Sequence, residues 1–246
     1  MRILGIIPAR YASTRFPAKP LIDIAGKSMI QRVYEQVRKS GRIARVVVAT
    51  DHVEIFNHVQ NFGEACMTRE NHISGTDRCF EALSLQKEIF DYVINIQGDE
   101  PFIQPEQIDL LAAKLNGQIE IATLVKSIEQ EEQLFNANIV KAVINLHTEA
   151  LYFSRSAIPH IRNTPEPEWL RKQKFYKHIG MYAYRSDVLE QLTKLPPSSL
   201  EKAESLEQLR WLENGFKISV AETNTETIGI DTPEDLEKAL TYLRSL

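Results

Sequence analysis

Residues 3–20 read ILGIIPARYASTRFPAKP, and this stretch decides how the rest of the chain is interpreted. Its first five residues form an apolar run rich in isoleucine, which is typical of a strand buried on both faces of a parallel sheet. The run leads directly into a loop that carries Arg10, Arg15 and Lys19, with no carboxylate before Asp23. Because open α/β sheets bind ligands at the carboxyl ends of their strands, the stretch predicts an anion-binding loop there.

On charge alone, the same loop is equally well interpreted as an ordinary solvated basic segment. Its position after the first strand favours binding, and several converging cations suit a triphosphate. The prolines at positions 8, 17 and 20 restrict the loop and so reduce the entropy lost on binding. The loop lacks the glycine-rich fingerprints of P-loop NTPases and of dinucleotide-binding domains, which disfavours both classes.

The first half of the chain alternates between apolar runs and helical spacing. Strands are predicted at 3–7, 46–50 and 92–96, and helices at 28–39, 53–62 and 105–115. Asp51 is expected to cap the second of these helices. This βαβαβ order predicts an α/β fold with a doubly wound, mostly parallel sheet.

The second half is less regular. Strands are predicted at 121–126, 140–144 and 179–184, an exposed mobile loop at 163–174, and helices at 198–214 and 234–243. We find no internal repeat and no linker long enough to divide the chain. We therefore expect a single domain over 1–246 with an inserted smaller lobe within about 126–216.

Composition narrows the class of protein. The chain has 246 residues, a net charge of −4 and two cysteines, Cys66 and Cys79, without a Cys-x-x-Cys pair. A disulfide framework or structural zinc site is not expected, nor is a broad nucleic-acid surface. No apolar run approaches the about 20 residues that cross a bilayer, and the start is too quickly polar for a secretory signal. We expect a cytoplasmic enzyme or binding protein for small molecules.

Candidate metal ligands follow the strand at 92–96. The sequence continues Gln97-Gly98-Asp99-Glu100, so Asp99 should lie on the same sheet edge as the basic loop. Mg²⁺ is commonly held by one or two carboxylates together with substrate phosphates. Asp231 is the best candidate for a second carboxylate, although Asp-Thr-Pro-Glu is also a good helix start and capping is the stronger interpretation without further context. Glu100 is an auxiliary candidate.

Three other patterns have ordinary structural interpretations when taken alone. His72-Ile-Ser-Gly-Thr-Asp-Arg78 reads as a capped helix start. The strand containing His178 places Gly180, Tyr182 and Tyr184 on the same face, but a single strand histidine is more often structural. Residues 204, 207, 208 and 211 form a polar stripe on the predicted helix, which is typically a solvated face.

Taken together, the motifs resemble the sugar cytidylyltransferase family, and within it the members that act on 3-deoxy-manno-octulosonate (Kdo). The resemblance begins with Pro-Ala-Arg-x-x-Ser-Thr-Arg-x-Pro-x-Lys-Pro in the basic loop and spans nearly the whole chain. It continues through Ala49-Thr50-Asp51, His72-x-Ser-Gly-Thr-Asp-Arg78, Gln97-Gly-Asp-Glu-Pro101, Tyr152-Phe-Ser-Arg155, His178-x-Gly-x-Tyr182, Glu204-x-Leu-Glu-Gln-Leu-Arg210 and Gly229-x-Asp-Thr-Pro-Glu-Asp-Leu236. Each motif is weak alone. Some relatives carry Glu at the position of Asp77, a conservative difference.

The resemblance implies a nucleotide-diphospho-sugar-transferase-like fold and a set of site residues. Implied nucleotide-binding residues are Pro8, Ala9, Arg10, Lys19, Ser74, Gly75 and Arg78. Implied sugar-binding residues are Arg15, Gln97, Arg155, His178, Tyr182, Glu207 and Gln208. Asp99 and Asp231 are the implied metal ligands, and together with Arg10 and Lys19 they form the implied catalytic group.

The implied reaction is Mg²⁺-dependent transfer of CMP from CTP to the anomeric hydroxyl of Kdo, giving CMP-Kdo and pyrophosphate. The resemblance also implies a cytoplasmic homodimer that supplies lipopolysaccharide biosynthesis. Competing hypotheses are transfer to another acid sugar, such as an N-acylneuraminate or 8-amino-Kdo, and a nucleotide sensor without activity. An NAD-dependent oxidoreductase is disfavoured because the glycine fingerprint is missing.

Overall fold

The computed structural model describes residues 1–246 apart from 13–15, 227–228, 231 and 245–246. The chain divides into two compact units. Unit 1 comprises 1–112 and 226–246, and unit 2 comprises 113–225. Unit 2 is therefore an insertion within unit 1, and it contains the segment 126–216 in which we expected a smaller lobe. A role of this segment in sugar binding or dimerisation stays a prediction.

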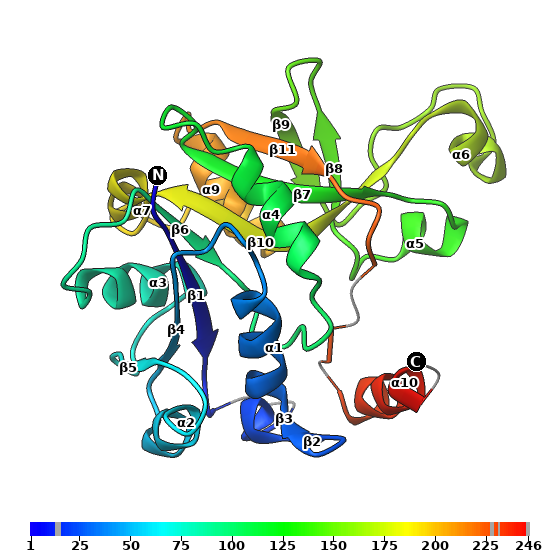
Figure 1. Ribbon diagram of the computed structural model, residues 1–246. Helices are drawn as coiled ribbons and strands as arrows, with labels where there is room; N and C mark the ends of the chain where they lie inside the picture. Colours follow the sequence, from blue (N-terminus) through cyan, green and yellow to red (C-terminus); the bar gives the residue numbers. More distant parts are fainter. Residues whose placement is uncertain (13–15, 227–228, 231, 245–246) are drawn as a thin grey trace. The chain divides into compact units, whose positions relative to one another are not determined.

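Unit 1 is built on four parallel strands (Figure 1). They lie in the order β6-β1-β4-β5, with bounds Tyr92–Asn95, Ile3–Ala9, Arg45–Thr50 and Ala65–Met67. The three predicted strands of this half are confirmed, and β5 was not anticipated. Nearly every residue of β1 and β4 is buried, as their continuous apolar runs require. The carboxyl ends of these strands form one edge, and the basic loop (residues 10–20) begins there at the end of β1.

Helices pack on both faces of these strands. α1 (Met29–Arg38) and α3 (Gly75–Ser84) lie on opposite sides of β1, and α2 (Val53–Val59) packs against β4 and β5 (Figure 1). α4 (Pro105–Ala113) is linked to the end of α1 by the hydrogen bond that Ser40 Oγ donates to Asp109 Oδ1 at 2.5 Å. α1 begins at Ser28, whose hydroxyl accepts the amide N–H of Gln31 at 3.2 Å. Its apolar residues face the sheet. The doubly wound α/β prediction is confirmed.

The predicted cap of α2 is wrong. His52, not Asp51, is the capping residue, and its side chain accepts from the amide of Glu54. Asp51 instead forms an ion pair with a buried arginine of α3. A carboxylate at this position satisfies a buried cation, a stronger requirement than an exposed helix end that a neighbouring side chain can satisfy.

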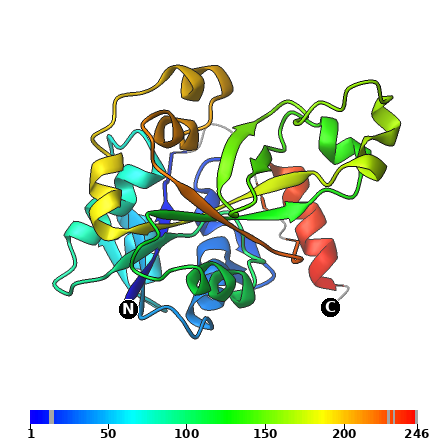
Figure 2. The same cartoon turned by 90° about the horizontal axis from the view of Figure 1, so that it is seen from above.

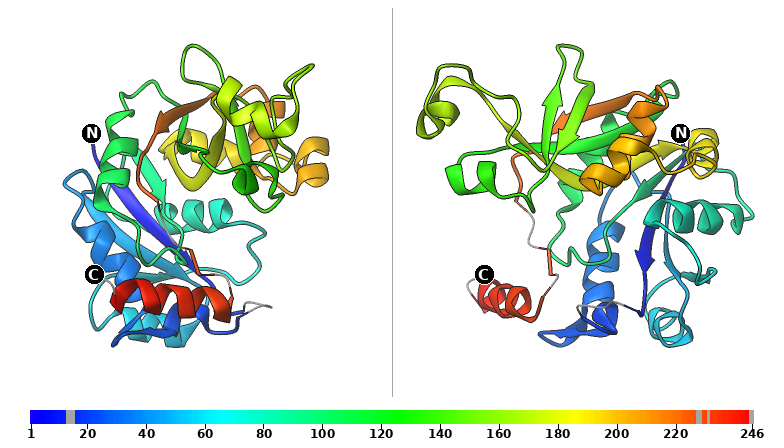
Figure 3. Two further views of the ribbon diagram at one scale, coloured as in Figure 1. Left: turned by 90° about the vertical axis from the view of Figure 1, so that its right-hand side faces the viewer. Right: turned by 180° about the vertical axis from the view of Figure 1, so that it is seen from behind.

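The remaining elements of unit 1 are short ones that follow β1 in the chain and the terminal helix. They are η1 (Lys19–Leu21), the two-stranded sheet β2–β3 (Asp23–Ile24 and Lys27–Ser28) and the terminal helix α10 (Pro233–Arg244). α10 packs near β2, where Ile24, Met29, Phe102, Ile230 and Ala239 form a buried cluster (Figure 3). The chain therefore returns to unit 1 after the insertion and brings Ile230 into this cluster.

Unit 2 contains a mixed set of strands (Figure 2). β7 (Ile121–Ser127) pairs parallel to β11 (Ile218–Glu222) and antiparallel to β10 (Tyr176–Arg185). β8 (Lys141–Ile144) pairs antiparallel with both β10 and β9 (Ala150–Ser154). The predicted strands of this half are confirmed, with β10 longer than expected and β9 and β11 unanticipated. The pairing of β10 with β7 shifts register between Ile179 and Tyr182, which marks a bulge.

Two predictions in unit 2 need correction. The segment 163–174 is largely exposed as predicted, but it is not a loop throughout: it contains η2 (Glu166–Glu168) and α6 (Trp169–Lys172), and Trp169 packs in a cluster with Ile128, Leu134 and Phe175. Its mobility stays a prediction. A single buried indole thus outweighs a charged, proline-rich surrounding sequence.

The second wrong prediction is the continuous helix at 198–214. It is broken into α8 (Ser199–Glu204) and α9 (Gln208–Glu213) at Ser205, which has a left-handed φ of 52°. Figure 3 shows α9 and α7 (Ser186–Leu192) at one end of unit 2, with α5 (Glu131–Phe135) and α6 at the other. Among the residues that the structure describes, no helix combines the length and apolar character that a membrane crossing requires.

Candidate active site

The basic loop begins where β1 ends. Lys19 Nζ lies 2.8 Å from Asp99 Oδ2, and the two side chains are only 14% and 33% exposed. The expectation that Asp99 shares the edge of the basic loop is thereby confirmed. Arg10 follows β1 and donates from Nη2 to the carbonyl oxygen of His72 at 2.7 Å. Arg15 lies outside the described residues, so its predicted role in sugar binding stays a prediction.

Close backbone packing fixes the turn that carries Asp99. A Cβ on Gly98 would lie 2.7 Å from the carbonyl oxygen of Pro8, so only glycine lets this turn approach the end of β1. The amide of Ile230 donates to the backbone carbonyl of Asp99 at 2.9 Å. The segment before α10 is thus tied to the turn that carries the candidate metal ligand.

The second predicted metal ligand, Asp231, lies outside the described residues. The helix start that offered its alternative role is nevertheless described. Thr232 Oγ1 accepts the amide of Asp235 at 3.3 Å, and Asp235 Oδ2 accepts the amide of Thr232 at 3.1 Å. This reciprocal pair caps the start of α10. The two interpretations of Asp231, as a cap and as a metal ligand, both stay predictions.

Whether these residues suit Mg²⁺ can be judged from their chemistry. Within the described ranges, no group of three or more His, Cys, Asp and Glu side chains is placed to hold a metal. One partly exposed carboxylate beside a lysine, at the carboxyl edge of the sheet, fits an ion shared with substrate phosphates.

The predicted base-binding segment forms the start of α3. Ser74 and Asp77 make a capping box, so the structural interpretation of this motif is confirmed. The capping box uses the amide N–H groups of Ser74 and Asp77, and the dipole of α3 favours negative charge at this helix start. A Cβ on Gly75 would lie 3.9 Å from Pro8, which places the end of β1 beside this helix start. Ala9 is buried in β1.

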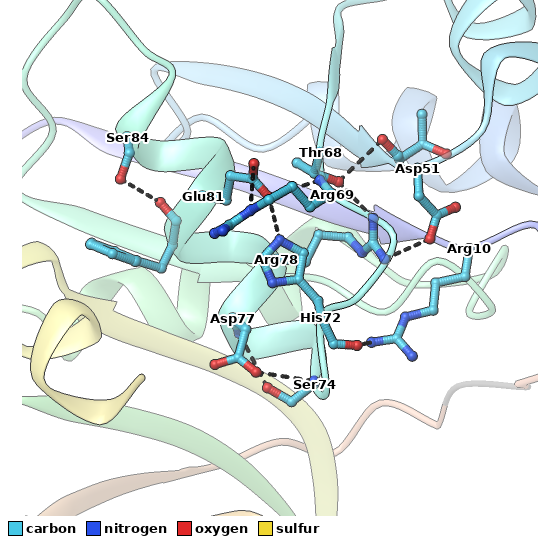
Figure 4. Close-up of polar contacts among 12 residues, drawn as sticks. Arg10, Asp51, Thr68, Arg69, His72, Ser74, Asp77, Arg78, Glu81 and Ser84 are labelled. Atoms are coloured by element: carbon cyan, nitrogen blue, oxygen red, sulfur yellow. Dashed lines mark hydrogen bonds and ion pairs between the residues drawn. The ribbon is translucent and has the colours of Figure 1, made fainter. Parts of the chain in front are cut away.

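The Arg78 side chain is not exposed beside this segment but lies in the protein interior (Figure 4). Its side chain is completely buried, and it donates to Asp51 Oδ2 and Thr68 Oγ1, both at 2.6 Å. Burial lowers the pKa of Arg78, while Asp51 acts in the opposite direction. In the structure Arg78 joins α3 to the ends of β4 and β5, and its contact with a nucleotide stays a prediction.

Motif spacing did not reveal Glu81, Asn95 or Thr68. Glu81 on α3 accepts hydrogen bonds from the amide of Arg69 at 2.9 Å and from the His72 ring (Figure 4). Asn95 ends β6, and its Oδ1 is buried without a hydrogen-bond partner among the described residues. A polar residue inside the apolar run YVINI was the available signal for Asn95. The hydrogen-bond partners of Glu81 and Thr68 come together only in the folded chain, so motif spacing gave no signal for these two residues.

The predicted sugar-binding residues of unit 2 centre on β10. The His178 ring lies 5.1 Å from the Tyr182 ring, which stacks at 5.9 Å on Tyr184, so the predicted shared face is confirmed. His178 Nε2 lies 2.9 Å from Thr123 Oγ1, and burial lowers the pKa of His178 to about 3. The imidazole is therefore neutral near pH 7. The Tyr182 hydroxyl is buried and has no partner within the described ranges.

Arg155 has backbone partners in the structure. Its guanidinium donates to the carbonyl oxygens of Glu204 at 2.7 Å and Ala137 at 3.2 Å, while its amide donates to the Glu204 carboxylate at 3.0 Å. Below it, the buried Lys141 donates to three carbonyl oxygens, including that of Arg155 at 2.6 Å. These contacts join the end of β9 to the segments at Ala137 and Glu204. Contact of Arg155 with a sugar stays a prediction.

The polar stripe predicted on 204–211 is not a solvated helix face. Glu207 is the N-cap residue of α9, and Gln208 and Trp211 are buried. Because Ser205 breaks the helix, the spacing counted along the sequence does not describe one surface. Gln97 follows β6 in unit 1. Roles of Glu207, Gln208 and Gln97 toward a sugar stay predictions.

Comparison with known proteins adds independent information. The cytidylyltransferase family pattern matches residues 4–219. The chain is 58% identical to a 3-deoxy-manno-octulosonate cytidylyltransferase of Cytophaga hutchinsonii, over 95% of this chain and 94% of the relative. It is 57% identical to the protein of the same name from Parabacteroides distasonis, over 99% of this chain and 98% of that one.

A solved structure of CMP:2-keto-3-deoxy-manno-octonic acid synthetase in complex with CTP matches with a TM-score of 0.92. The two chains are 43% identical, and the match covers 100% of this chain and 99% of the other. A 4-diphosphocytidyl-2C-methyl-D-erythritol synthase from Anaerococcus prevotii matches with a TM-score of 0.65 at 13% identity, covering 99% of this chain and 98% of the other. This second likeness shows the fold alone.

Proposed function

Because the chain belongs to the cytidylyltransferase family, we propose that it transfers CMP from CTP to the anomeric hydroxyl of Kdo, giving CMP-Kdo and pyrophosphate. The observation that carries the proposal is the pairing of Lys19 with Asp99 at the carboxyl edge of the unit 1 sheet. It places a cation for phosphate beside a carboxylate for a metal. This edge is where an α/β sheet binds a nucleotide.

Unit 1 supplies the groups that a triphosphate needs. Arg10 retains further N–H donors after its bond to His72, since a guanidinium carries five. Lys19 contributes a second positive charge, and the start of α3 offers backbone dipoles. We assign Pro8, Gly75 and their neighbours to the nucleoside and the two cations to the phosphates, where they stabilise the negative charge that develops on pyrophosphate.

Asp99 and Asp231 are the proposed ligands of Mg²⁺. When bound, the ion supplies charge neutralisation at the phosphates and lowers the pKa of a coordinated hydroxyl. In the reaction, the anomeric hydroxyl loses its proton to solvent and its oxygen forms a bond to the α-phosphorus, while the bond from this phosphorus to the bridging oxygen of pyrophosphate breaks. We assign no protein side chain as a general base. Lys19 holds the Asp99 carboxylate in position.

The charges in unit 2 constrain how an acid sugar is held. His178 is neutral near pH 7, so it can exchange hydrogen bonds with a hydroxyl but cannot neutralise a carboxylate. The buried Tyr182 hydroxyl would gain a partner from a sugar hydroxyl. Arg155 is already engaged with carbonyl oxygens, so we assign the sugar carboxylate chiefly to Arg15.

We further propose a cytoplasmic homodimer that supplies lipopolysaccharide biosynthesis. The resemblance to sugar cytidylyltransferases supports these statements. Sedimentation of the purified protein at micromolar concentration tests the dimer, which a single species of 28.2 kDa would contradict.

The decisive experiment measures pyrophosphate release with CTP and Mg²⁺ in the presence of Kdo, N-acetylneuraminate or no sugar. Release with Kdo alone supports the reaction and the acceptor. Release only with the other acid sugar would keep CMP transfer and overturn the acceptor. A folded protein that binds CTP and releases nothing with any sugar would be a sensor. Omitting Mg²⁺ and adding EDTA tests the metal requirement, and undiminished release would contradict it.

A further inference from the structure

The segment between β5 and α3 has no strand or helix of its own, yet it carries the carbonyl that Arg10 binds. At its start, Thr68 donates its amide to Thr50 O at 2.8 Å, and its hydroxyl accepts from Arg78. At its end, the Ser74–Asp77 capping box fixes the entry to α3. Between these anchors, residues 70–73 form turns and bends, and Ile73 is 82% exposed. The middle of the segment therefore needs a separate anchor.

Glu81 is this anchor (Figure 4). One of its oxygens, Oε2, accepts both the amide N–H of Arg69 at 2.9 Å and the His72 ring Nε2. Its other oxygen lies 3.3 Å from Arg69 Nε. A carboxylate only accepts, so His72 carries its proton on Nε2. Burial would raise the pKa of Glu81, but the bonds from Arg69 and His72 lower it below its usual value.

Holding the His72 ring also fixes the direction of the His72 carbonyl. The side chains of Glu81 and His72 are 19% and 7% exposed, so water competes little for this bond. The carbonyl oxygen of the same residue accepts from Arg10 Nη2 at 2.7 Å. The chain of contacts thus runs from α3 through Glu81 and His72 to Arg10, the first cation after β1.

We propose that Glu81 is a positioning residue for CTP, which acts through His72 to hold Arg10 toward the triphosphate. This inference rests on the proposed function and deepens its nucleotide site. Without Glu81, the turn at 70–73 gains freedom and Arg10 loses its fixed acceptor. CTP binding would then have to order both the turn and Arg10, and this entropy cost would weaken the affinity.

The test is a double-mutant cycle on CTP affinity, measured by calorimetry on the whole protein. Glu81→Ala is expected to weaken CTP binding about tenfold, the scale of a charge-assisted hydrogen-bond network. Glu81→Gln keeps an oxygen that can accept from both Arg69 N–H and His72 Nε2–H, so it should restore most of the affinity. In an Arg10→Ala background, Glu81→Ala should change affinity by less than about twofold.

Two controls separate positioning from general damage. Gln86→Ala removes the 2.7 Å bond to the Ala82 carbonyl at the far end of α3 and should leave CTP affinity unchanged. Arg69→Ala removes an exposed guanidinium but keeps the backbone amide that Glu81 binds, and it should also be close to wild type. In steady state, KM for CTP should rise in Glu81→Ala while KM for the sugar stays constant.

Two results would overturn the inference: wild-type CTP affinity in Glu81→Ala, or a tenfold loss that persists when Arg10 is already alanine. If Glu81→Ala does not fold, His72→Ala removes the other end of the same contact and carries the same expectation. Failure of the proposed function looks different, because then the wild-type protein itself neither binds CTP nor releases pyrophosphate.

Discussion

Lys19 Nζ and Asp99 Oδ2 lie 2.8 Å apart although 80 positions separate them in the sequence. The contact joins the basic loop after β1 to the turn after β6. These two strands are neighbours in the sheet. Two opposite charges at this edge serve different partners in the proposed reaction. The lysine suits a phosphate, and the carboxylate suits a cation.

Replacing Asp99 by Asn is expected to lower turnover by at least about 100-fold, because a neutral amide is a poor ligand for Mg²⁺ and no longer pairs with Lys19. Pyrophosphate release measures the effect, with circular dichroism to verify folding. Asp91→Asn, at the opposite end of β6, is the matched control and should retain activity. Near-normal turnover of the Asp99 variant would contradict the metal assignment.

Asp51→Ala is expected to destabilise the protein by about 3 kcal/mol, because it leaves the Arg78 guanidinium buried without its counter-charge. Urea unfolding measures the change. Glu64→Ala removes a more exposed partner of Arg45 and should cost less than about 1 kcal/mol. Equal effects of the two substitutions would show that the Asp51–Arg78 pair is not what stabilises this region.

Gly98→Ala should impair both stability and activity, since the new Cβ would meet Pro8 O at 2.7 Å and push the Asp99 turn away from β1. A cost of about 1–3 kcal/mol is expected for such overpacking. Gly41→Ala has open space around the added methyl group and provides the control. Thermal unfolding and pyrophosphate release of both variants decide the matter; a Gly98 variant that matches Gly41→Ala in both assays would refute the close approach.

His178 makes stability depend on pH. Burial lowers its pKa to about 3 from 6.5, so between these values the unfolded chain binds more protons than the native one. Stability from this group is therefore complete above about pH 6.5 and is lost as the pH falls, by about 2 kcal/mol between pH 7 and pH 5.

The comparison of wild type with His178→Gln isolates this contribution, because the carboxylates that also titrate at low pH are common to both proteins. Urea unfolding at pH 7 and pH 5 should show a smaller loss in the variant. Parallel losses in both proteins would mean that His178 titrates normally in the native state.

Much of unit 1 was predictable because its evidence is local. A parallel strand covered on both faces must be apolar throughout, so the apolar runs of the sequence identify β1, β4 and β6 directly. The amphipathic spacing of α1 is equally local. The placement of Asp99 near the basic loop followed from topology alone, since parallel strands end at one edge.

The irregular parts of unit 2 were harder to predict from the sequence. Trp169 lies in a sequence rich in charge and proline, and only its packing against Phe175 and Leu134 shows that the segment is ordered. Likewise, nothing in the helical spacing of 198–214 reveals the left-handed turn at Ser205. At Trp169, burial outweighs local propensity.

The sequence by itself determined the doubly wound fold of unit 1, the basic loop after β1 and the resemblance to cytidylyltransferases, because each depends on residue types in a fixed local order. Only the tertiary structure decided which charges meet. Asp51 pairs with Arg78 rather than capping a helix, and Glu81 holds His72 behind Arg10. The physical reason is that a buried charge must find its partner across space, and the sequence spacing between such partners is set by the fold.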